Sequence, residues 1–145
     1  MIVFGLITTS VNYVLLKRSY NKIKQTAEKL FKVRVFRNGV YQSIDNVDIV
    51  PGDLYEPAEE VPCDSIVVKG ELFVDECNLT GENVPIAKFK IIDDANHSDK
   101  SHWLFEGSKV ETMKDHTLAL AINVGYASQR GRIIRKILNK TSKQP

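Results

Sequence analysis

The chain has 145 residues, of which 43% are hydrophobic and 26% are charged, a composition typical of one globular domain with its own core. Lysine and arginine number 20 against 18 aspartates and glutamates, and both signs are spread along the chain. A protein dedicated to nucleic acid needs a concentrated basic face, and its aromatic residues would alternate with basic ones on strands. Neither pattern occurs here, so we predict no nucleic-acid partner.

The beginning of the chain allows two interpretations. Residues 1–16 are apolar but interrupted by polar side chains, and they are shorter than the roughly 20 residues that span a bilayer. A basic stretch follows from Lys17 to Lys32, which is typical of the cytoplasmic end of a membrane helix. The segment is therefore either the end of a transmembrane helix or an amphipathic helix docked on the domain. Apolar positions at helical spacing predict one long helix that ends near Leu30.

Short β-prone segments separated by turn signals fill the middle of the chain. Asn38-Gly39 between apolar runs predicts a hairpin, because both residues tolerate positive φ. Pro51-Gly52 predicts a tight turn, and Lys69-Gly70 predicts another turn between two strands. Further strands are expected at 65–68 and 72–74, on either side of Lys69-Gly70, and at 103–105, 108–112 and 117–124. A polar surface loop is expected between 89 and 101.

The last element is a predicted helix over residues 128–139. Isoleucines and a leucine lie on one face and basic residues on the other, and Ser128 can cap the first turn. The fold class is therefore mainly β, a compact, distorted jelly-roll-like or β-barrel-like domain with a helix at each end.

No metal or nucleotide site is indicated by the remaining residue types. The cysteines, Cys63 and Cys77, form neither a CxxC pair nor a metal-ligand spacing, and we expect two reduced thiols. The three histidines are scattered, and no two of them are four residues apart. The chain also contains no P-loop, so neither a metal nor a cofactor is expected to bind to it.

The segment with recognisable chemistry is residues 79–85, Leu-Thr-Gly-Glu-Asn-Val-Pro. Gly81 permits a sharp turn without side-chain bulk, so another surface can approach the chain closely. Glu82 beside it offers a carboxylate that can orient water or accept a proton, and Pro85 stiffens the exit. On residue types alone, however, an ordinary surface turn explains the tripeptide better.

The same run resembles the Thr-Gly-Glu-Ser signature of the actuator domain of P-type ATPases, with Asn83 in place of the usual serine. Further segments match the family pattern in the same order over roughly residues 33–138. They are Pro51-Gly52-Asp53, Pro62-Cys63-Asp64 with Gly70, residues 105–110, Gly125-Tyr126 and residues 131–134. Several matched segments in one order make the resemblance specific.

The resemblance implies roles for the residues of the run. In P-type ATPases, the glutamate positions the water that hydrolyses an aspartyl-phosphate held by another domain. Glu82 is then the catalytic residue, Thr80 and Gly81 shape the loop at the phosphate, and Asn83 and Pro85 support it. The partners implied are the phosphorylation and nucleotide-binding domains of the same full-length chain and its membrane helices. ATP and Mg²⁺ are expected in that full-length pump, and the present chain alone is predicted to be inactive.

The resemblance also implies an arrangement along the chain and a subfamily. Residues 1–32 would be the end of a membrane or stalk helix, 33–127 the β-rich actuator domain, and 128–145 a helical linker towards the next membrane span. The protein would then lie in a membrane with this domain facing the cytosol, and the candidate internal membranes are endolysosomal and endoplasmic reticulum membranes. The motifs are most similar to type V pumps, which act on cations or polyamines, with type II and type IV pumps as alternatives. The rival class is a membrane-tethered β-barrel adaptor without catalysis.

Overall fold

The computed structural model describes residues 10–15, 17–18, 29–82, 84–92 and 99–141, which fall in two compact units, Met1–Phe31 and Lys32–Pro145. In the first unit, residues 10–15 and 17–18 are helical and exposed, and residues 29–31 are not helical. The predicted first helix is confirmed over residues 10–15 and 17–18, its part from 19 to 28 lies outside the described residues, and residues 29–31 are not part of it. None of the helices in the described part of the chain has the length and apolar character needed to cross a bilayer.

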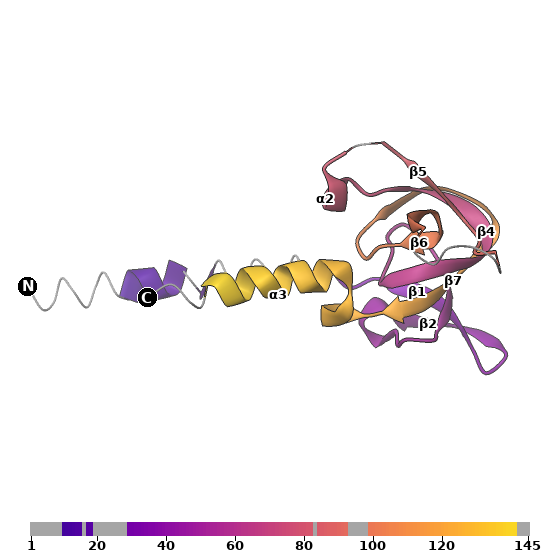
Figure 1. Ribbon diagram of the computed structural model, residues 1–145. Coiled ribbons are helices and arrows are strands. Elements are labelled where there is room, and N and C mark those ends of the chain that lie inside the picture. The colour runs from indigo at the N-terminus through magenta and orange to yellow at the C-terminus, as the bar shows by residue number, and fades with distance from the viewer. Residues whose placement is uncertain (1–9, 16, 19–28, 83, 93–98, 142–145) are drawn as a thin grey trace, which may run out of the picture. The chain divides into compact units, whose positions relative to one another are not determined.

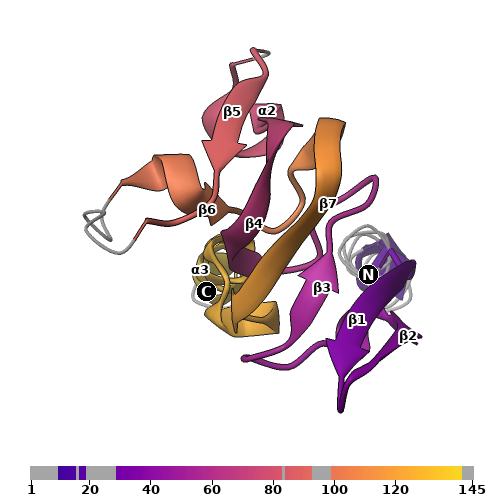
Figure 2. The same cartoon turned by 90° about the vertical axis from the view of Figure 1, so that its right-hand side faces the viewer.

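The second unit is built on a 7-stranded antiparallel sheet with the order β2-β1-β3-β7-β4-β5, in which β6 pairs with β4 (Figures 1 and 2). Its strands are β1 Lys32–Arg37, β2 Val40–Asp45, β3 Leu54–Glu56, β4 Asp64–Asp75, β5 Ile86–Phe89, β6 Trp103–Leu104 and β7 Lys109–Asn123. The helices of this unit are α2 Cys77–Thr80 and α3 Gln129–Thr141, with 3₁₀ turns η1 Asn46–Asp48, η2 Lys100–His102 and η3 Gly125–Ala127. The mainly β fold is confirmed, but the sheet is open between β2 and β5 and does not close into a barrel.

The core lies where β3, β7 and β4 pair at the centre of the sheet (Figure 2). In β1 and β3, alternate residues point inwards and are buried, so these strands contribute every second side chain to the core. The fully buried apolar side chains include Val33, Val35, Tyr55, Val67, Leu72, Val74, Leu104 and Ala119. The Tyr55 hydroxyl makes a 2.6 Å hydrogen bond with Ser65 Oγ, so its burial leaves no polar atom unsatisfied.

Two turns follow the sequence prediction closely. The β1–β2 hairpin turns at Asn38 and Gly39, whose φ values of 53° and 82° are those of the predicted turn. The Pro51-Gly52 turn is stabilised by the Asp53 carboxylate. This group accepts hydrogen bonds from Arg37 Nε at 2.7 Å and from the backbone N–H of Val50 at 2.9 Å. The Arg37 guanidinium lowers the pKa of the buried Asp53 carboxyl below its ordinary value.

The predicted turn at Lys69-Gly70 is wrong, because β4 runs unbroken through both residues. Gly70 has a φ of 81° and lies in a β-bulge, where the register with β7 shifts on either side of Lys69. Opposite it, β7 is one 15-residue strand where two strands were expected, with His116 at a φ of 34°. A glycine at positive φ can form a bulge as well as a turn. The sequence therefore predicted the unusual backbone conformation at Gly70 correctly but assigned it to the wrong structure.

We predict that Gly70→Ala strongly destabilises the chain. A Cβ at this position would lie 2.5 Å from Thr117 Oγ1 and 2.9 Å from Thr117 Cα, in addition to the unfavourable φ. Together these effects should lower the free energy of unfolding by about 2–5 kcal/mol, measured by urea denaturation. Gly52→Ala is the matched control, since Gly52 also has positive φ but has no atom within 4 Å of its Cβ position. The control should lose about 1–2 kcal/mol, and an equal loss in both variants would contradict the steric argument.

Candidate functional site

The Thr-Gly-Glu run lies directly after a one-turn helix that the sequence did not predict. β4 ends at Asp75, and Glu76 then leads into α2. The residue that caps the end of α2 is Gly81, which has the left-handed conformation with a φ of 79°. The backbone N–H of Gly81 closes the turn with a 2.9 Å bond to the carbonyl of Cys77. We call residues 76–85, which connect β4 to β5, the Thr-Gly-Glu loop (Figure 1). Gly81 thus allows the chain to leave the helix at the point where Glu82 begins.

The Thr80 hydroxyl links the helix to Glu82. It donates a hydrogen bond to the carbonyl of Glu76 at 3.2 Å and accepts one from the backbone N–H of Glu82, also at 3.2 Å. The same Glu76 carbonyl accepts the backbone N–H groups of Leu79 at 2.8 Å and Thr80 at 3.0 Å. The Glu76 carbonyl and the Thr80 hydroxyl therefore contribute both to the conformation of α2 and to the direction of the chain at Glu82.

The predicted site residues are displayed on the surface. Thr80, Gly81, Glu82 and Pro85 are all exposed, while Asn83 lies outside the described residues. No atom lies within 4 Å of the position that a Gly81 Cβ would occupy, so another molecule can approach the loop at this point. The Glu82 carboxylate is available to a partner or to water.

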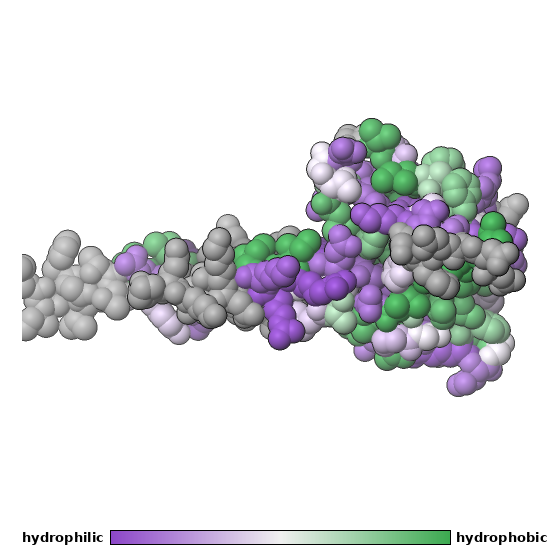
Figure 3. All heavy atoms as spheres, in the orientation of Figure 1, coloured by the Kyte–Doolittle hydropathy of each residue, from purple (hydrophilic) through white to green (hydrophobic). Residues whose placement is uncertain are grey.

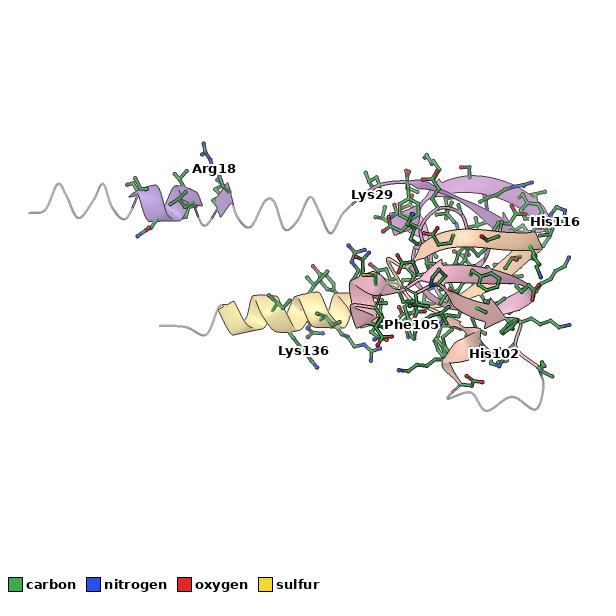
Figure 4. The ribbon with its side chains drawn as sticks, turned by 90° about the horizontal axis from the view of Figure 1, so that it is seen from above. Arg18, Lys29, His102, Phe105, His116 and Lys136 are labelled. Carbon is green, nitrogen blue, oxygen red and sulfur yellow. The ribbon has the colours of Figure 1, made fainter. Side chains whose placement is uncertain are left out.

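Beneath the loop lies a cavity of about 300 Å³. Thr80 and Leu79 line it from the loop, and Phe105 and Gln129 line it from the body of the unit. Figure 4 labels Phe105 and His102, which lie on the segment that carries η2 and β6. The loop is therefore not packed against an apolar core, and α2 contains no buried residue.

A buried ion pair stands at the base of the loop. Lys88 on β5 is 1% exposed and Glu76 is 6% exposed, and Lys88 Nζ lies 2.6 Å from Glu76 Oε1. Lys88 Nζ also donates a 3.0 Å hydrogen bond to the carbonyl of Lys100 and lies 5.5 Å from the centre of the Phe105 ring. The sequence analysis missed this pair, because a lysine in a β-prone segment is ordinarily expected at the surface.

A second buried carboxylate joins the sheet to the start of α3. Asp64 is 2% exposed, and it accepts the backbone N–H of Glu106 at 3.1 Å and that of Gln129 at 2.7 Å. Ser128 caps α3 as predicted, because its hydroxyl accepts the backbone N–H of Gly131 at 2.9 Å. Burial raises the pKa of the neighbouring Glu106 carboxyl. The first turn of α3 is thereby fixed to β4 by charged and polar groups.

The remaining candidate ligands do not assemble into a metal site. His102 is buried and its Nδ1 lies 3.0 Å from the carbonyl of Phe89, and His116 is exposed. Cys63 is buried, which raises the pKa of its thiol to about 12 and keeps it protonated. Within the described ranges, no three His, Cys, Asp or Glu side chains are grouped so that they could hold a metal ion. The described residues therefore do not fit Mg²⁺ as a resident ion of this chain.

Comparison with known proteins places this geometry in a family. A model of the P-type ATPase actuator domain matches residues 29–138, well over half of the chain. The chain belongs to the P-type ATPase actuator domain family. Its fold is also similar to that of a zinc-transporting PIB-type ATPase in the E2.Pi state, with a TM-score of 0.62 at 20% identity over 79% of this chain and 17% of that one.

Curated relatives of this actuator domain include two much longer proteins. A vacuolar cation-transporting ATPase of Saccharomyces cerevisiae is 28% identical over 128 residues, which cover 73% of this chain and 9% of that protein. The human polyamine-transporting ATPase 13A2 is 29% identical over 112 residues, which cover 70% of this chain and 10% of that protein. The chain thus spans about one tenth of the length of these relatives.

We predict that Thr80→Val frees the end of the loop while the fold stays intact. Valine has nearly the shape of threonine but can neither donate to the Glu76 carbonyl nor accept from the Glu82 N–H. Loss of a net hydrogen bond of about 0.5–1.5 kcal/mol should speed amide hydrogen exchange at Glu82 by roughly 2- to 10-fold. Thr80→Ser keeps both bonds and serves as the control. Unchanged exchange at Glu82 in Thr80→Val would show that the hydroxyl does not order the loop.

We predict that Asp64→Ala destabilises the chain and loosens the first turn of α3. The substitution removes a buried carboxylate that accepts two part-buried hydrogen bonds, from the N–H groups of Glu106 and Gln129, which should cost about 2–4 kcal/mol in the free energy of unfolding. Asp99→Ala is the control, since Asp99 also accepts a backbone N–H, that of Ser101 at 2.9 Å, but is exposed. The control should lose at most about 1 kcal/mol in urea denaturation. Equal losses would remove the special role of Asp64.

Proposed function

We propose that this actuator domain dephosphorylates the aspartyl-phosphate intermediate of a full-length ATP-driven transporter and couples that step to transport. The observation that carries the proposal is the display of Glu82. The carboxylate follows a left-handed glycine at the end of α2, is exposed, and has open space beside it at Gly81. A single carboxylate presented in this way can act on a group held by another domain.

The chemistry assigned to Glu82 is that of a general base. A water molecule held by the carboxylate attacks the phosphorus atom, the bond from phosphorus to the aspartyl oxygen breaks, and the aspartate leaves as a carboxylate. Glu82 takes the proton of the attacking water, and inorganic phosphate is released. A positioned base of this kind contributes about 10²–10⁴ in rate. Thr80 and Gly81 set the direction of the chain at Glu82, and Asn83 and Pro85 are proposed to support the loop.

The rest of the site belongs to partners within the same full-length chain. ATP with Mg²⁺, bound by the nucleotide-binding and phosphorylation domains, would supply the phosphoryl group. Residues 1–32 and 128–145 are proposed to lead to membrane helices, with the domain over 33–127 between them. Rotation of the actuator domain would then act on those helices through such links. The basic residues of α3, together with its exposed Ile133 and Ile137, suit a linker near a membrane surface (Figure 3).

Cations or polyamines are the substrates that we propose, with the domain facing the cytosol from an internal membrane. The support is the similarity to two relatives, one a vacuolar cation-transporting ATPase and the other a polyamine-transporting ATPase. We also propose that the pump is of type V, on the motifs given above. The alternative of a β-barrel adaptor finds no support, because the sheet is open and the family match covers most of the unit.

We predict that Glu82→Gln in the full-length pump traps the phosphorylated intermediate. Glutamine keeps the size of the side chain but cannot accept a proton from water. Decay of the phosphoenzyme should slow by about 10²-fold or more, while its formation from ATP stays unchanged. The measurement is loss of ³²P from the phosphoenzyme in a chase with unlabelled ATP.

Glu59→Gln is the matched control for this experiment. Glu59 is likewise an exposed glutamate of this unit, but it lies on a different loop, so its variant should decay at the wild-type rate. A Glu82→Gln pump that decays as fast as the control would refute the assigned role. An unchanged free energy of unfolding in the Glu82→Gln chain is also expected, because the side chain is exposed.

A further inference from the structure

We propose that the buried pair Glu76–Lys88 is the tether that positions the Thr-Gly-Glu loop, so that these two residues set the rate of dephosphorylation without touching the phosphate. The inference rests on the proposed function of Glu82 and assigns two positioning residues to it. Glu76 precedes the loop and Lys88 follows it, on β5. Their contact at 2.6 Å therefore joins the two sides of the loop at its base, next to the backbone pairing of Val74 with Ile86.

The pairing of the strands directs Lys88 inwards. Lys88 lies opposite Leu72 of β4, and Val74 lies opposite Ile86, so Lys88 shares the face of Leu72 and Val74, which are 1% and 0% exposed. A lysine ammonium on a buried face is strongly unfavourable unless it is paired. Here Glu76 Oε1, the carbonyl of Lys100 and the face of Phe105 surround it. These three groups together stabilise the positive charge of the Lys88 side chain in its buried position.

A continuous series of contacts runs from this pair to Glu82. The Glu76 side chain is held by Lys88, and the Glu76 carbonyl accepts the N–H and the hydroxyl of Thr80. The Thr80 hydroxyl in turn accepts the N–H of Glu82. The Glu76 side chain makes no capping hydrogen bond to α2, so its one described polar contact is with Lys88.

Other contacts are too weak to place the loop. No residue of α2 is buried, and the cavity of about 300 Å³ lies beside it. The Asn78 side chain donates to the carbonyl of Gly107 at 3.3 Å, near the long limit for a hydrogen bond. Glu76 Oε1 accepts no hydrogen bond among the described residues, so the pair holds the loop through the attraction between two opposite charges that are both removed from water.

The test removes the tether and keeps the fold. A single Lys88→Met change leaves a buried unpaired carboxylate and can unfold the chain, so the variant of choice is the double change Glu76→Leu with Lys88→Met. Replacing both charges by apolar groups of similar size should preserve thermal stability. The matched control is Glu71→Leu with Lys114→Met, which removes an exposed ion pair between the neighbouring strands β4 and β7.

Two readouts are measured. In the 145-residue chain, amide hydrogen exchange at Leu79, Thr80 and Gly81 should speed up at least 10-fold in the tether variant, while β1 and β3 exchange as before. In the full-length pump, phosphoenzyme decay should slow at least 10-fold with phosphoenzyme formation unchanged. The control variant should alter neither readout. A tether that served stability alone would change the melting temperature and leave these two readouts as in wild type.

The outcomes separate the two proposals. If Glu82→Gln slows decay and the tether variant decays within 2-fold of wild type, the tether proposal is overturned and the function of Glu82 stands. If hydrogen exchange of the loop speeds up but Glu82→Gln leaves decay unchanged, the tether stands as a structural device and the proposed function fails. Unchanged exchange of the loop in a folded tether variant would overturn the tether whatever the pump does.

Discussion

The pairing of β4 with β7 is the constraint on which the other features of the unit depend. β4 has 12 residues and β7 has 15, and together they cross the centre of the sheet. Asp64 at the first end of β4 fixes the start of α3, and the last residues of β4 lead through Glu76 into the Thr-Gly-Glu loop. One strand therefore carries both the attachment of the exit helix and the attachment of the loop. The bulge at Gly70 bends β4 between these two attachments. The loop and the start of α3 also meet at one cavity, which Thr80 and Gln129 both line.

Charged groups, rather than apolar packing, make the attachments at both ends of β4. Asp64 binds two backbone N–H groups, and Glu76 binds the ammonium of Lys88. Such contacts have a narrow geometry, because a buried charge is stable only when its partner is correctly placed. Apolar contacts can slide with little cost, whereas these cannot. The rotation that we propose for this domain would act through attachments of this kind.

The sequence predicted the features that depend on neighbouring residues. Asn38-Gly39, the Ser128 cap and the exposure of Thr80 to Glu82 follow from local conformational preference and hydrogen bonding. The interpretation of Gly70 failed because positive φ alone does not distinguish a turn from a bulge, and the residue that decides it, Thr117, lies far along the chain. The burial of Lys88 was missed because it, too, depends on residues that are distant in the sequence. Its partners Glu76, Lys100 and Phe105 come together only in the tertiary structure.

Because α2 contains no buried residue, the residues proposed to act in dephosphorylation are not part of the core that stabilises the fold. A substitution of Glu82 changes an exposed side chain, so the altered chain should accumulate in cells to normal levels. Substitutions at Asp64 or Gly70 instead lower the free energy of unfolding and expose the chain to degradation. Protein abundance would then distinguish two classes of variant: those that are present but lack the proposed activity, and those that are missing.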